Sequence, residues 1–310
     1  MSTYLVTGGA GFIGSNIVKK LLDQGNRIRV LDNFATGKRS NILPFMSNPN
    51  FEMFEGDLRS FHIVRTAVKD VDYVLHQGAL PSVPRSINDP ITTNDVNILG
   101  TLNVLEASRE FGVKRVVYAS SSSVYGNSEV MPKQEDMPVA PLSPYALTKY
   151  AAERYCQIYT SLYGLETVCL RYFNVFGPNQ DPTSQYSAVI PKFITDMMKG
   201  IQPVIYGDGT QSRDFTYVDN NVAANIMACT APGVAGEVFN IACGERYTLL
   251  DLVKIINEIL GTSINPILSQ ERAGDVKHSL ASIEKAGKGL KFKPLVNFKD
   301  GLVKTVESLR

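Results

Sequence analysis

Hydrophobic residues along the first half of the chain follow two alternating patterns. Short apolar runs, rich in β-branched or aromatic residues, stand at 4–8, 27–32, 51–57, 72–79 and 114–121. In the stretches between them apolar residues return every three or four positions, as in 12–25 and 97–112. Buried strands that alternate with amphipathic helices predict a doubly wound α/β fold, with a parallel sheet covered by helices on both faces.

The pattern changes after about residue 174. Proline and glycine become denser, and helices and strands no longer alternate cleanly, although 217–230 is typical of a helix and 237–244 of a strand. We therefore predict that the chain leaves the sheet domain for a smaller α/β lobe, returns to the sheet, and leaves again. The predicted sheet domain is 1–173 plus about 216–241, and the predicted smaller lobe is 174–215 and 242–310.

Composition and charge narrow the possible partners. The 310 residues include 31 basic and 30 acidic side chains, a formal net charge of +1, so we expect neither a nucleic acid nor a membrane as partner. The four cysteines form no C-x-x-C pair and the three histidines lie far apart, so we expect neither a disulfide framework nor a metal site. Without a signal-peptide pattern or a membrane-length apolar run, the chain is expected in the cytoplasm.

Three glycines, Gly8, Gly11 and Gly14, stand between the first predicted strand and the first predicted helix. Such a turn lets the backbone approach a pyrophosphate, whose charge is stabilised at the N-terminus of the helix. Asp32 ends the second predicted strand, about 20 residues beyond the turn, where a carboxylate accepts hydrogen bonds from an adenosine ribose. The same carboxylate would repel a 2′-phosphate. The pattern predicts a Rossmann-type dinucleotide site that prefers NAD to NADP.

Two further features follow predicted strands, at the edge where open α/β sheets bind ligands. Asp57 comes after the third strand and either meets the adenine or caps the next helix; the sequence leaves both interpretations open. The serine run 120–123 ends a later strand, on the same edge as the glycine turn. A serine run is often a polar turn, but this position favours a place in the active site.

Tyr145 and Lys149 are four residues apart in a helical stretch and therefore lie on the same helix face. Taken alone, the pair is more typical of a half-buried tyrosine beside a solvated lysine. Tyrosine has an ordinary pKa of about 10, and nearby positive charge favours its ionised form. Lys149 and an oxidised nicotinamide would both supply that charge. Together with the glycine turn and the serine run, the pair predicts a phenolate that takes a hydroxyl proton while hydride passes to the nicotinamide.

With these motifs in this order, the chain resembles the extended short-chain dehydrogenase/reductase family over essentially its whole length. Within that family it is most similar to nucleotide-sugar epimerases, in particular bacterial UDP-N-acetylglucosamine 4-epimerases. The resemblance is carried by the segments "GALPSVPRSINDP", "SSSSVYG", "PLSPYALTKY", "LRYFNVFGPNQDP", "SAVIPKF", "GDGTQSRDF" and "RAGDVKHSLAS".

The resemblance implies roles for individual residues. The catalytic residues would be Ser121, Ser122, Ser123, Tyr145 and Lys149. Those that hold NAD would be Gly8, Gly11, Phe12, Ile13, Asp32, Asn33, Phe34, Thr36, Gly37, Asp57, Leu58, Gln77, Gly78, Ala79, Asn97, Ala119, Tyr145, Lys149 and Tyr172. Those that hold the UDP-sugar would be Pro81, Ser82, Ser121, Ser122, Asn174, Val189, Val204, Tyr206, Arg213, Arg272, Asp275 and Ser279. Paired arginines suit phosphate oxygens.

The implied reaction is reversible C4 epimerisation of UDP-N-acetylglucosamine and UDP-N-acetylgalactosamine through a transient 4-keto sugar. Because no acidic residue accompanies the serine run, a 4,6-dehydratase is disfavoured. Ser279 stands where family members restricted to unacetylated sugars tend to have tyrosine, and a small side chain leaves room for an acetamido group. UDP-glucose and UDP-glucuronate 4-epimerases stay open as alternatives, the latter with Arg85 as the one candidate for the uronate carboxylate. So does a non-catalytic sensor of NAD or sugar nucleotides.

The resemblance also implies an assembly. Family members pair through the helix near 97–107 and the helix that carries Tyr145. We therefore expect a homodimer with a four-helix interface.

Overall fold

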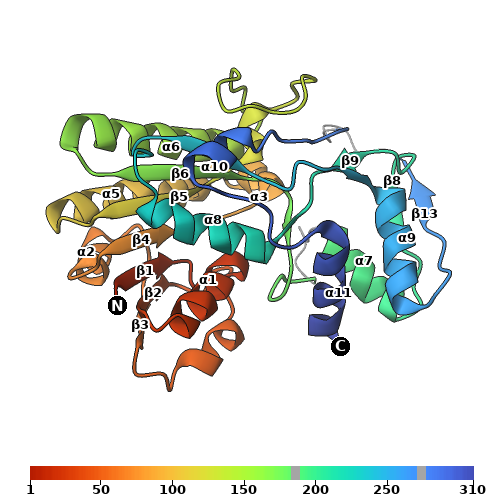
Figure 1. The fold of residues 1–310 in the computed structure, drawn as a ribbon, viewed down its shortest axis with the longest axis horizontal. Coiled ribbons are helices and arrows are strands. Elements are labelled where there is room, and N and C mark those ends of the chain that lie inside the picture. The colour runs from red at the N-terminus through yellow and green to blue at the C-terminus, as the bar shows by residue number, and fades with distance from the viewer. Residues whose placement is uncertain (183–188, 271–276) are drawn as a thin grey trace.

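A computed structural model describes residues 1–182, 189–270 and 277–310. Within these residues the largest element is a seven-stranded sheet in which all neighbouring strands are parallel (Figure 1). Its strands, in spatial order, are β11 (Val238–Ile241), β6 (Thr167–Tyr172), β5 (Arg115–Ser121), β4 (Tyr73–His76), β1 (Thr3–Thr7), β2 (Arg27–Asp32) and β3 (Phe51–Glu55). The predicted doubly wound parallel sheet is confirmed.

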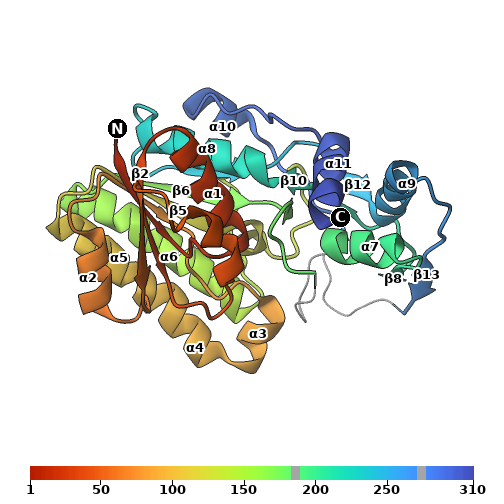
Figure 2. The ribbon, with the colours of Figure 1, turned by 90° about the horizontal axis from the view of Figure 1, so that it is seen from below.

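Helices cover both faces of this sheet (Figure 2). One face carries α1 (Phe12–Asp23), α8 (Val218–Thr230) and α10 (Glu284–Gly289). The other carries α2 (Phe61–Val68), α5 (Gly100–Glu110) and α6 (Pro144–Tyr163). Because both faces are covered, a central strand is buried along its whole length rather than at alternate residues: every residue of β6 is buried, including Arg171.

The carboxyl end of β4 leads into a run of short helical segments. These are α3 (Val83–Asn88), α4 (Pro90–Asn94) and a π-helical turn (Asp95–Leu99), which continues directly into α5. Side chains cap the first two: Ser82 accepts a hydrogen bond from the N–H of Arg85, and Asp89 accepts one from the N–H of Thr92. The segments α3 and α4 pack against α6 beside the carboxyl edge of the sheet.

The later chain builds a second group of elements beside the sheet (Figure 1). It comprises α7 (Val189–Met198), β8 (Val204–Tyr206), β9 (Ser212–Arg213), β12 (Tyr247–Thr248), α9 (Leu249–Leu260), β13 (Ile267–Ser269) and α11 (Phe298–Leu309). β8 pairs with β13 and β9 with β12. The chain crosses between the two groups where β7 (Val175–Phe176) pairs with β10 (Thr216–Tyr217). α10 lies against β11 of the large sheet although it comes late in the chain.

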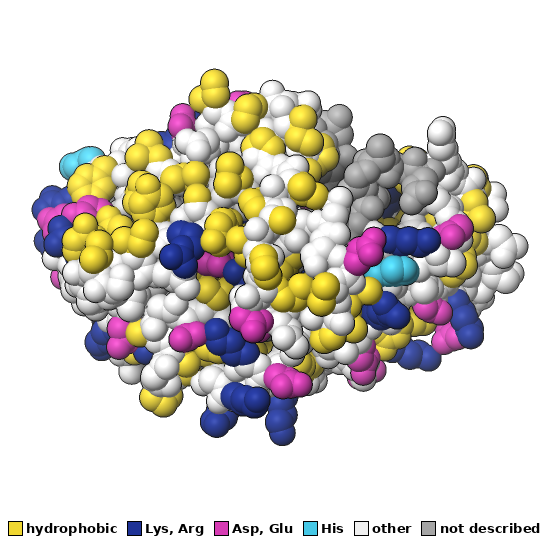
Figure 3. All heavy atoms as spheres, turned by 90° about the horizontal axis from the view of Figure 1, so that it is seen from above, with side chains coloured by type: hydrophobic (Ala, Val, Ile, Leu, Met, Phe, Trp, Pro, Cys, Tyr) yellow, Lys and Arg dark blue, Asp and Glu magenta, His cyan; other side chains and the backbone are white. Residues whose placement is uncertain are grey.

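The surface shows no segregation of charge on the face drawn in Figure 3. There, within the part of the chain that is described, basic and acidic side chains are interspersed, and hydrophobic side chains gather over the larger group of elements. Among the described residues, none of the helices has the length and apolar character required to cross a membrane.

Candidate active site

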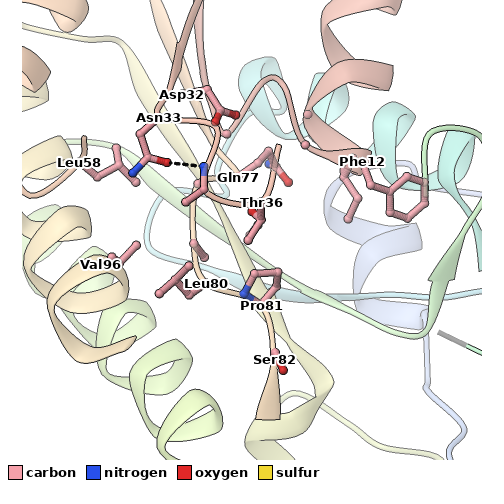
Figure 4. A pocket seen from close by; sticks show the side chains of 18 of the residues that line it. Phe12, Asp32, Asn33, Thr36, Leu58, Gln77, Leu80, Pro81, Ser82 and Val96 are labelled. Carbon is pink, nitrogen blue, oxygen red and sulfur yellow. Dashed lines mark hydrogen bonds between the residues drawn. The ribbon is translucent and has the colours of Figure 1, made fainter. Parts of the chain in front are cut away.

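A cavity of about 1000 Å³ opens at the carboxyl edge of the sheet, above β1, β2 and β4. Figure 4 shows Asp32 and Asn33 at one end of it and Pro81 and Ser82 toward the other. The residues predicted from the sequence that line it are Gly8, Gly11, Phe12, Ile13, Asp32, Asn33, Thr36, Asp57, Leu58, Gln77, Gly78, Ala79, Pro81, Ser82, Ala119, Tyr145, Lys149 and Tyr172. The structure therefore brings most of the predicted NAD site to one cavity.

The glycine turn leads from β1 into α1 at this cavity. Gly8 has a φ of +67°, a conformation that disfavours other residues. A Cβ on Gly14 would lie 2.2 Å from the carbonyl oxygen of Gly8, so only glycine lets the first turn of α1 pack this closely. Gly11 lies at the N-terminus of α1, where unpaired N–H groups and the helix dipole suit a pyrophosphate. This arrangement fits a dinucleotide.

Asp32 is fixed by the backbone around it. Its Oδ2 accepts a hydrogen bond from the N–H of Ala10 at 2.9 Å, and its Oδ1 accepts one from the N–H of Phe34 at 2.8 Å. Burial raises the pKa of Asp32, and these N–H donors oppose the rise. Gly37 passes so close that a Cβ there would lie 3.0 Å from Asp32 Oδ2. The carboxylate is thus held at the end of β2, at the cavity wall.

Asp57 pairs with a neighbouring arginine rather than capping a helix. Arg59 donates from Nη2 to Asp57 Oδ2 at 2.7 Å, and Asn33 donates to the same oxygen at 3.0 Å. The hydrogen bond with Arg59 lowers the pKa of Asp57 to about 2. The residue at the cap position of α2 is Ser60, so the helix-cap interpretation of Asp57 is wrong.

The helix α6 places the tyrosine and the lysine. Ser143 caps it by accepting a hydrogen bond from the N–H of Ala146, and Pro144 suits its first position. Tyr145 is half-buried, while Lys149 is buried and donates from Nζ to the carbonyl oxygen of Ala119 at 2.8 Å. Burial lowers the pKa of Lys149 to about 8. Its ammonium is therefore bonded to β5, one turn from the phenol.

Burial also affects the ionisation of Tyr145. It raises the pKa of Tyr145, and a hydrogen bond with Ser121 opposes that rise. The sequence predicts that Lys149 lowers this pKa. In the structure the serine has that influence, and the lysine anchors the helix to the strand.

The serine run continues β5 into a 3₁₀ turn, Ser122–Tyr125. Ser121 caps this turn by accepting hydrogen bonds from the N–H and the hydroxyl of Ser123, at 3.2 and 2.9 Å. Ser121, Ser122 and Ser123 are half-buried. Ser120 lines the cavity, but its hydroxyl donates to Glu153. Ser121 is thus the serine that joins the strand end to Tyr145.

Three predicted cofactor residues lie outside the cavity lining. Asn97 is buried, accepts a hydrogen bond from the N–H of Leu80 and donates to Thr148, so it supports the wall. Phe34 lies under the guanidinium of Arg39, 3.9 Å from the ring centre. Gly37 provides the close approach to Asp32 described above. These three residues therefore lie behind the cavity lining and support the residues that form it.

Most predicted sugar-binding residues also lie outside this cavity. Asn174 follows β6, Val189 begins α7, Val204 and Tyr206 are in β8, Arg213 is in β9, and Ser279 is half-buried with its N–H bonded to Ser212. None of these is among the residues that line the cavity. Arg272 and Asp275 fall outside the described residues.

Asp214 ties these later segments together. Its Oδ1 accepts from the N–H of Cys243 at 2.9 Å, and its Oδ2 accepts from the N–H groups of Gly244 and Ala281 at 3.1 and 3.2 Å. Its side chain is fully buried, and burial raises its pKa to about 7 against these three donors. The segment that carries Arg213 is thereby fastened to the segment that carries Ser279.

Several lining residues were not assigned from the sequence. They are Leu31, Ala35, Gly56, Arg59, Leu80, Asp89, Thr92, Val96, Gln180 and Asp181. Of these, Gln180 and Asp181 belong to the segment "LRYFNVFGPNQDP" of the resemblance, and Arg59 is two residues after Asp57. Gly14, Arg85 and Ser120, which the sequence analysis also singles out, line the cavity as well. Thr92 and Val96 reach the cavity because α3, α4 and the π-helical turn fold back beside it, and their spacing in the sequence gave no signal.

The known proteins to which this chain is similar agree with a dinucleotide site of this kind. The model of the NAD dependent epimerase/dehydratase family matches residues 4–242. A protein of Methanocaldococcus jannaschii named putative UDP-glucose 4-epimerase is 40% identical over 308 residues, which cover 99% of this chain and 98% of that protein.

Two solved structures are similar over the same length. One is a UDP-N-acetylglucosamine 4-epimerase from Methanobrevibacter ruminantium M1, in complex with UDP-N-acetylmuramic acid; its TM-score is 0.94 at 41% identity, covering 99% of this chain and 98% of the other. The other is a UDP-glucose 4-epimerase from Thermotoga maritima with UDP-glucose, with a TM-score of 0.93 at 37% identity and the same coverage. This chain therefore belongs to the NAD-dependent epimerase/dehydratase family, and its cofactor is NAD.

Proposed function

We propose that this chain interconverts UDP-N-acetylglucosamine and UDP-N-acetylgalactosamine by inverting C4. The coarser activity, NAD-dependent 4-epimerisation of a UDP-sugar, follows from the family and from relatives that match nearly the whole chain. The observation that carries the proposal is that Tyr145 and Lys149 line the dinucleotide cavity, while Ser121, just behind its lining, hydrogen-bonds Tyr145.

Bound NAD would supply the group that takes a hydride from C4 of the sugar and returns it. Tyr145 takes the proton of the C4 hydroxyl and gives it back after the 4-keto sugar has turned. Ser121 hydrogen-bonds the reacting oxygen and the phenol, and Ser122 and Ser123 complete the polar surface around it. Lys149 fixes α6 to β5 and lies at the cavity wall, where it would hold the nicotinamide ribose. The predicted NAD and sugar residues keep these roles as part of the proposal.

Ser279 supports the choice of an acetylated sugar. It is half-buried, and it lies beside Ser212 and hence next to Arg213, the predicted phosphate ligand. A small side chain there leaves volume for a 2-acetamido group. Asn174, which comes before Arg213 in the chain, donates a hydrogen bond to the carbonyl oxygen of Asp214 and is therefore held next to Arg213 as well.

One observation favours a second candidate. Arg85 lines the cavity, in the stretch 82–89 close to Pro81 and Ser82. A guanidinium at that place would suit the carboxylate of UDP-glucuronate. UDP-glucuronate is therefore the substrate to test beside UDP-glucose.

Nuclear magnetic resonance distinguishes these possibilities. The protein with NAD is incubated separately with UDP-N-acetylglucosamine, UDP-glucose and UDP-glucuronate, and the C4 epimers are followed. We expect conversion of the acetylated sugar at the highest kcat/KM. Conversion of UDP-glucuronate alone would replace the substrate proposal, and binding without conversion of any sugar would identify a sensor.

We also propose a homodimer through α5 and α6. On α6 the residues Leu147, Ile158 and Leu162 are exposed and follow one helix stripe, and Leu99 is exposed just before α5. Paired copies would bury these side chains in a four-helix interface. Light scattering after size-exclusion chromatography should give a dimer for the protein and a monomer for Leu162→Glu. The predicted division into a cofactor and a substrate domain belongs to the same proposal.

A further inference from the structure

A fully buried ion pair lies beside the serine run. The side chains of Glu153 on α6 and Arg171 on β6 are 1% and 3% exposed. Arg171 donates from Nη2 to Glu153 Oε1 at 2.6 Å and from Nε to Glu153 Oε2 at 3.0 Å. Removing two ions from water is costly, and apolar residues of similar size generally hold a helix to a sheet at least as well. Packing alone therefore does not account for this pair.

The pair contacts both ends of the serine run. At its start, Ser120 Oγ donates to Glu153 Oε2 at 2.9 Å. The register of β5 and β6 sets Ser120 beside Arg171, so the contact is built into the sheet. After the run, the ring centre of Tyr125 lies 4.7 Å from the Arg171 guanidinium, and the Tyr125 hydroxyl donates to Asn240. Ser120 and Tyr125, which flank Ser121–Ser123 in the chain, therefore both contact the same buried ion pair.

The same helix face binds three consecutive residues of β5. Tyr145, Lys149 and Glu153 are spaced by four residues, so they follow one line along α6. Lys149 donates to the carbonyl of Ala119, Glu153 accepts from Ser120, and Tyr145 hydrogen-bonds Ser121. A shift of β5 along α6 would break all three contacts together.

We propose that Glu153, held by Arg171, is a positioning residue that fixes the end of β5 against α6 so that Ser121 meets Tyr145. The inference rests on the proposed function, because it concerns the proton transfer that Tyr145 performs there. Glu153 is not among the residues that line the cavity, so it acts through Ser120 and Ser121.

The consequence concerns the ionisation of Tyr145. The hydrogen bond with Ser121 opposes the effect of burial on the pKa of this phenol. Other charged or titratable groups lie around Tyr145. They are Lys149 on the same helix, Tyr118 on β5, Arg85 on α3, and Asp89 just after α3; Arg85 and Asp89 line the same cavity. None of these changes when the Glu153 contact is removed, so a shift in the tyrosine pKa reports on Ser121.

The test uses Ser120→Ala, which removes the hydrogen bond but keeps the ion pair. The matched control is Ser108→Ala, because Ser108 is also fully buried and its hydroxyl has no hydrogen-bond partner among the described residues. We expect kcat of Ser120→Ala to fall about 10-fold, the order expected for losing one hydrogen bond to a charged group. The KM for the UDP-sugar should stay the same, and the rise of kcat with pH should move to higher pH. Ser120→Thr, which keeps a hydroxyl, should restore both.

The proposal is overturned if kcat and the pH profile of Ser120→Ala equal those of Ser108→Ala, whether both variants keep the native values or both lose activity equally. Ultraviolet difference titration of the holoprotein against Tyr145→Phe gives the Tyr145 pKa without turnover. If no UDP-sugar is converted, the proposed function fails, while a raised Tyr145 pKa in Ser120→Ala still supports the positioning role and an unchanged one contradicts it.

Discussion

The segments before and after Asn174 hold their predicted site residues in different ways. Before it, Asp32 is fixed by backbone N–H groups and the end of β5 by side chains of α6, the helix that follows it, and with the glycine turn they line one cavity. After it, Arg213 lies on the short strand β9 and Ser279 on a segment without helix or strand, and Asp214 joins the two through the N–H of Ala281 while it also binds the N–H groups of Cys243 and Gly244.

The cofactor site and the sugar site therefore depend on different kinds of contacts to bring their residues together. The cofactor site needs only local strand–turn–helix order, because the carboxyl ends of neighbouring parallel strands meet at one edge. The sugar side needs segments that are 29 to 67 residues apart in the chain to be brought together first. We therefore expect changes before Asn174 to act on NAD and chemistry, and changes after it to act on the sugar alone.

The largest effect is expected from Tyr145→Phe. Without the phenol oxygen there is no general base at C4, so kcat should fall by about 10²- to 10⁴-fold. NAD content should stay near that of the unaltered protein, because the ring and Lys149 remain. The control is Tyr155→Phe, a half-buried tyrosine of the same helix that packs against the core. Native turnover by Tyr145→Phe would remove the basis of the proposed chemistry.

The next effect concerns stability in acid. His76 is buried between Thr7 and Thr101, and burial lowers its pKa from 6.5 to about 3. Below pH 6.5 the unfolded chain takes up this proton and the folded chain does not. The free energy of unfolding should therefore fall between pH 6.5 and about 3, by on the order of 5 kcal/mol from this group.

Denaturant unfolding at a series of pH values tests this expectation. In His76→Gln the decrease between pH 6.5 and 3 should be smaller by that amount, because no imidazole remains to be protonated. His62→Gln is the control, since His62 is exposed. Parallel curves for His76→Gln and the unaltered protein would show that this histidine does not contribute.

Asp214→Ala tests whether the segments after Asn174 act on the sugar alone. It leaves three buried N–H groups without an acceptor, which should lower the free energy of unfolding by about 2–4 kcal/mol. At a temperature where the variant is folded, KM for the UDP-sugar should rise while bound NAD is unchanged. Asp23→Asn, at an exposed ion pair on α1, is the control. Loss of NAD together with sugar affinity would mean that the two sides are not separable.

The smallest effect is expected from Ser279→Tyr. A large side chain would occupy the volume assigned to the acetamido group, lowering kcat/KM for UDP-N-acetylglucosamine by about 10- to 100-fold. The value for UDP-glucose should change little. Ser263→Tyr, at an exposed position of the same region, is the control. An equal loss with both sugars would contradict the size argument.

Particular elements show what could be predicted. The strands of the first half, the glycine turn, Asp32, and the Tyr145–Lys149 pair were predicted because each is a local pattern with a local cause. The helix-cap interpretation of Asp57 failed as an alternative because Arg59, only two residues away, pairs with the carboxylate. Asn97 is predicted in the NAD pocket, but it lies in the π-helical turn before α5, where its side chain hydrogen-bonds Leu80 and Thr148. Glu153 carried no signal, since its partners come from two strands.

The sequence alone determined the parallel sheet, the edge at which ligands bind, and the chemical groups available there, because spacing along strands and helices fixes which side chains share a face. The tertiary structure decided which groups meet. Burial, which depends on every surrounding segment, raises the pKa of Tyr145 and lowers that of Lys149. The contacts of Ser120 with Glu153 and of Asp214 with Gly244 and Ala281 join residues that no local pattern relates, so only the folded chain could establish them.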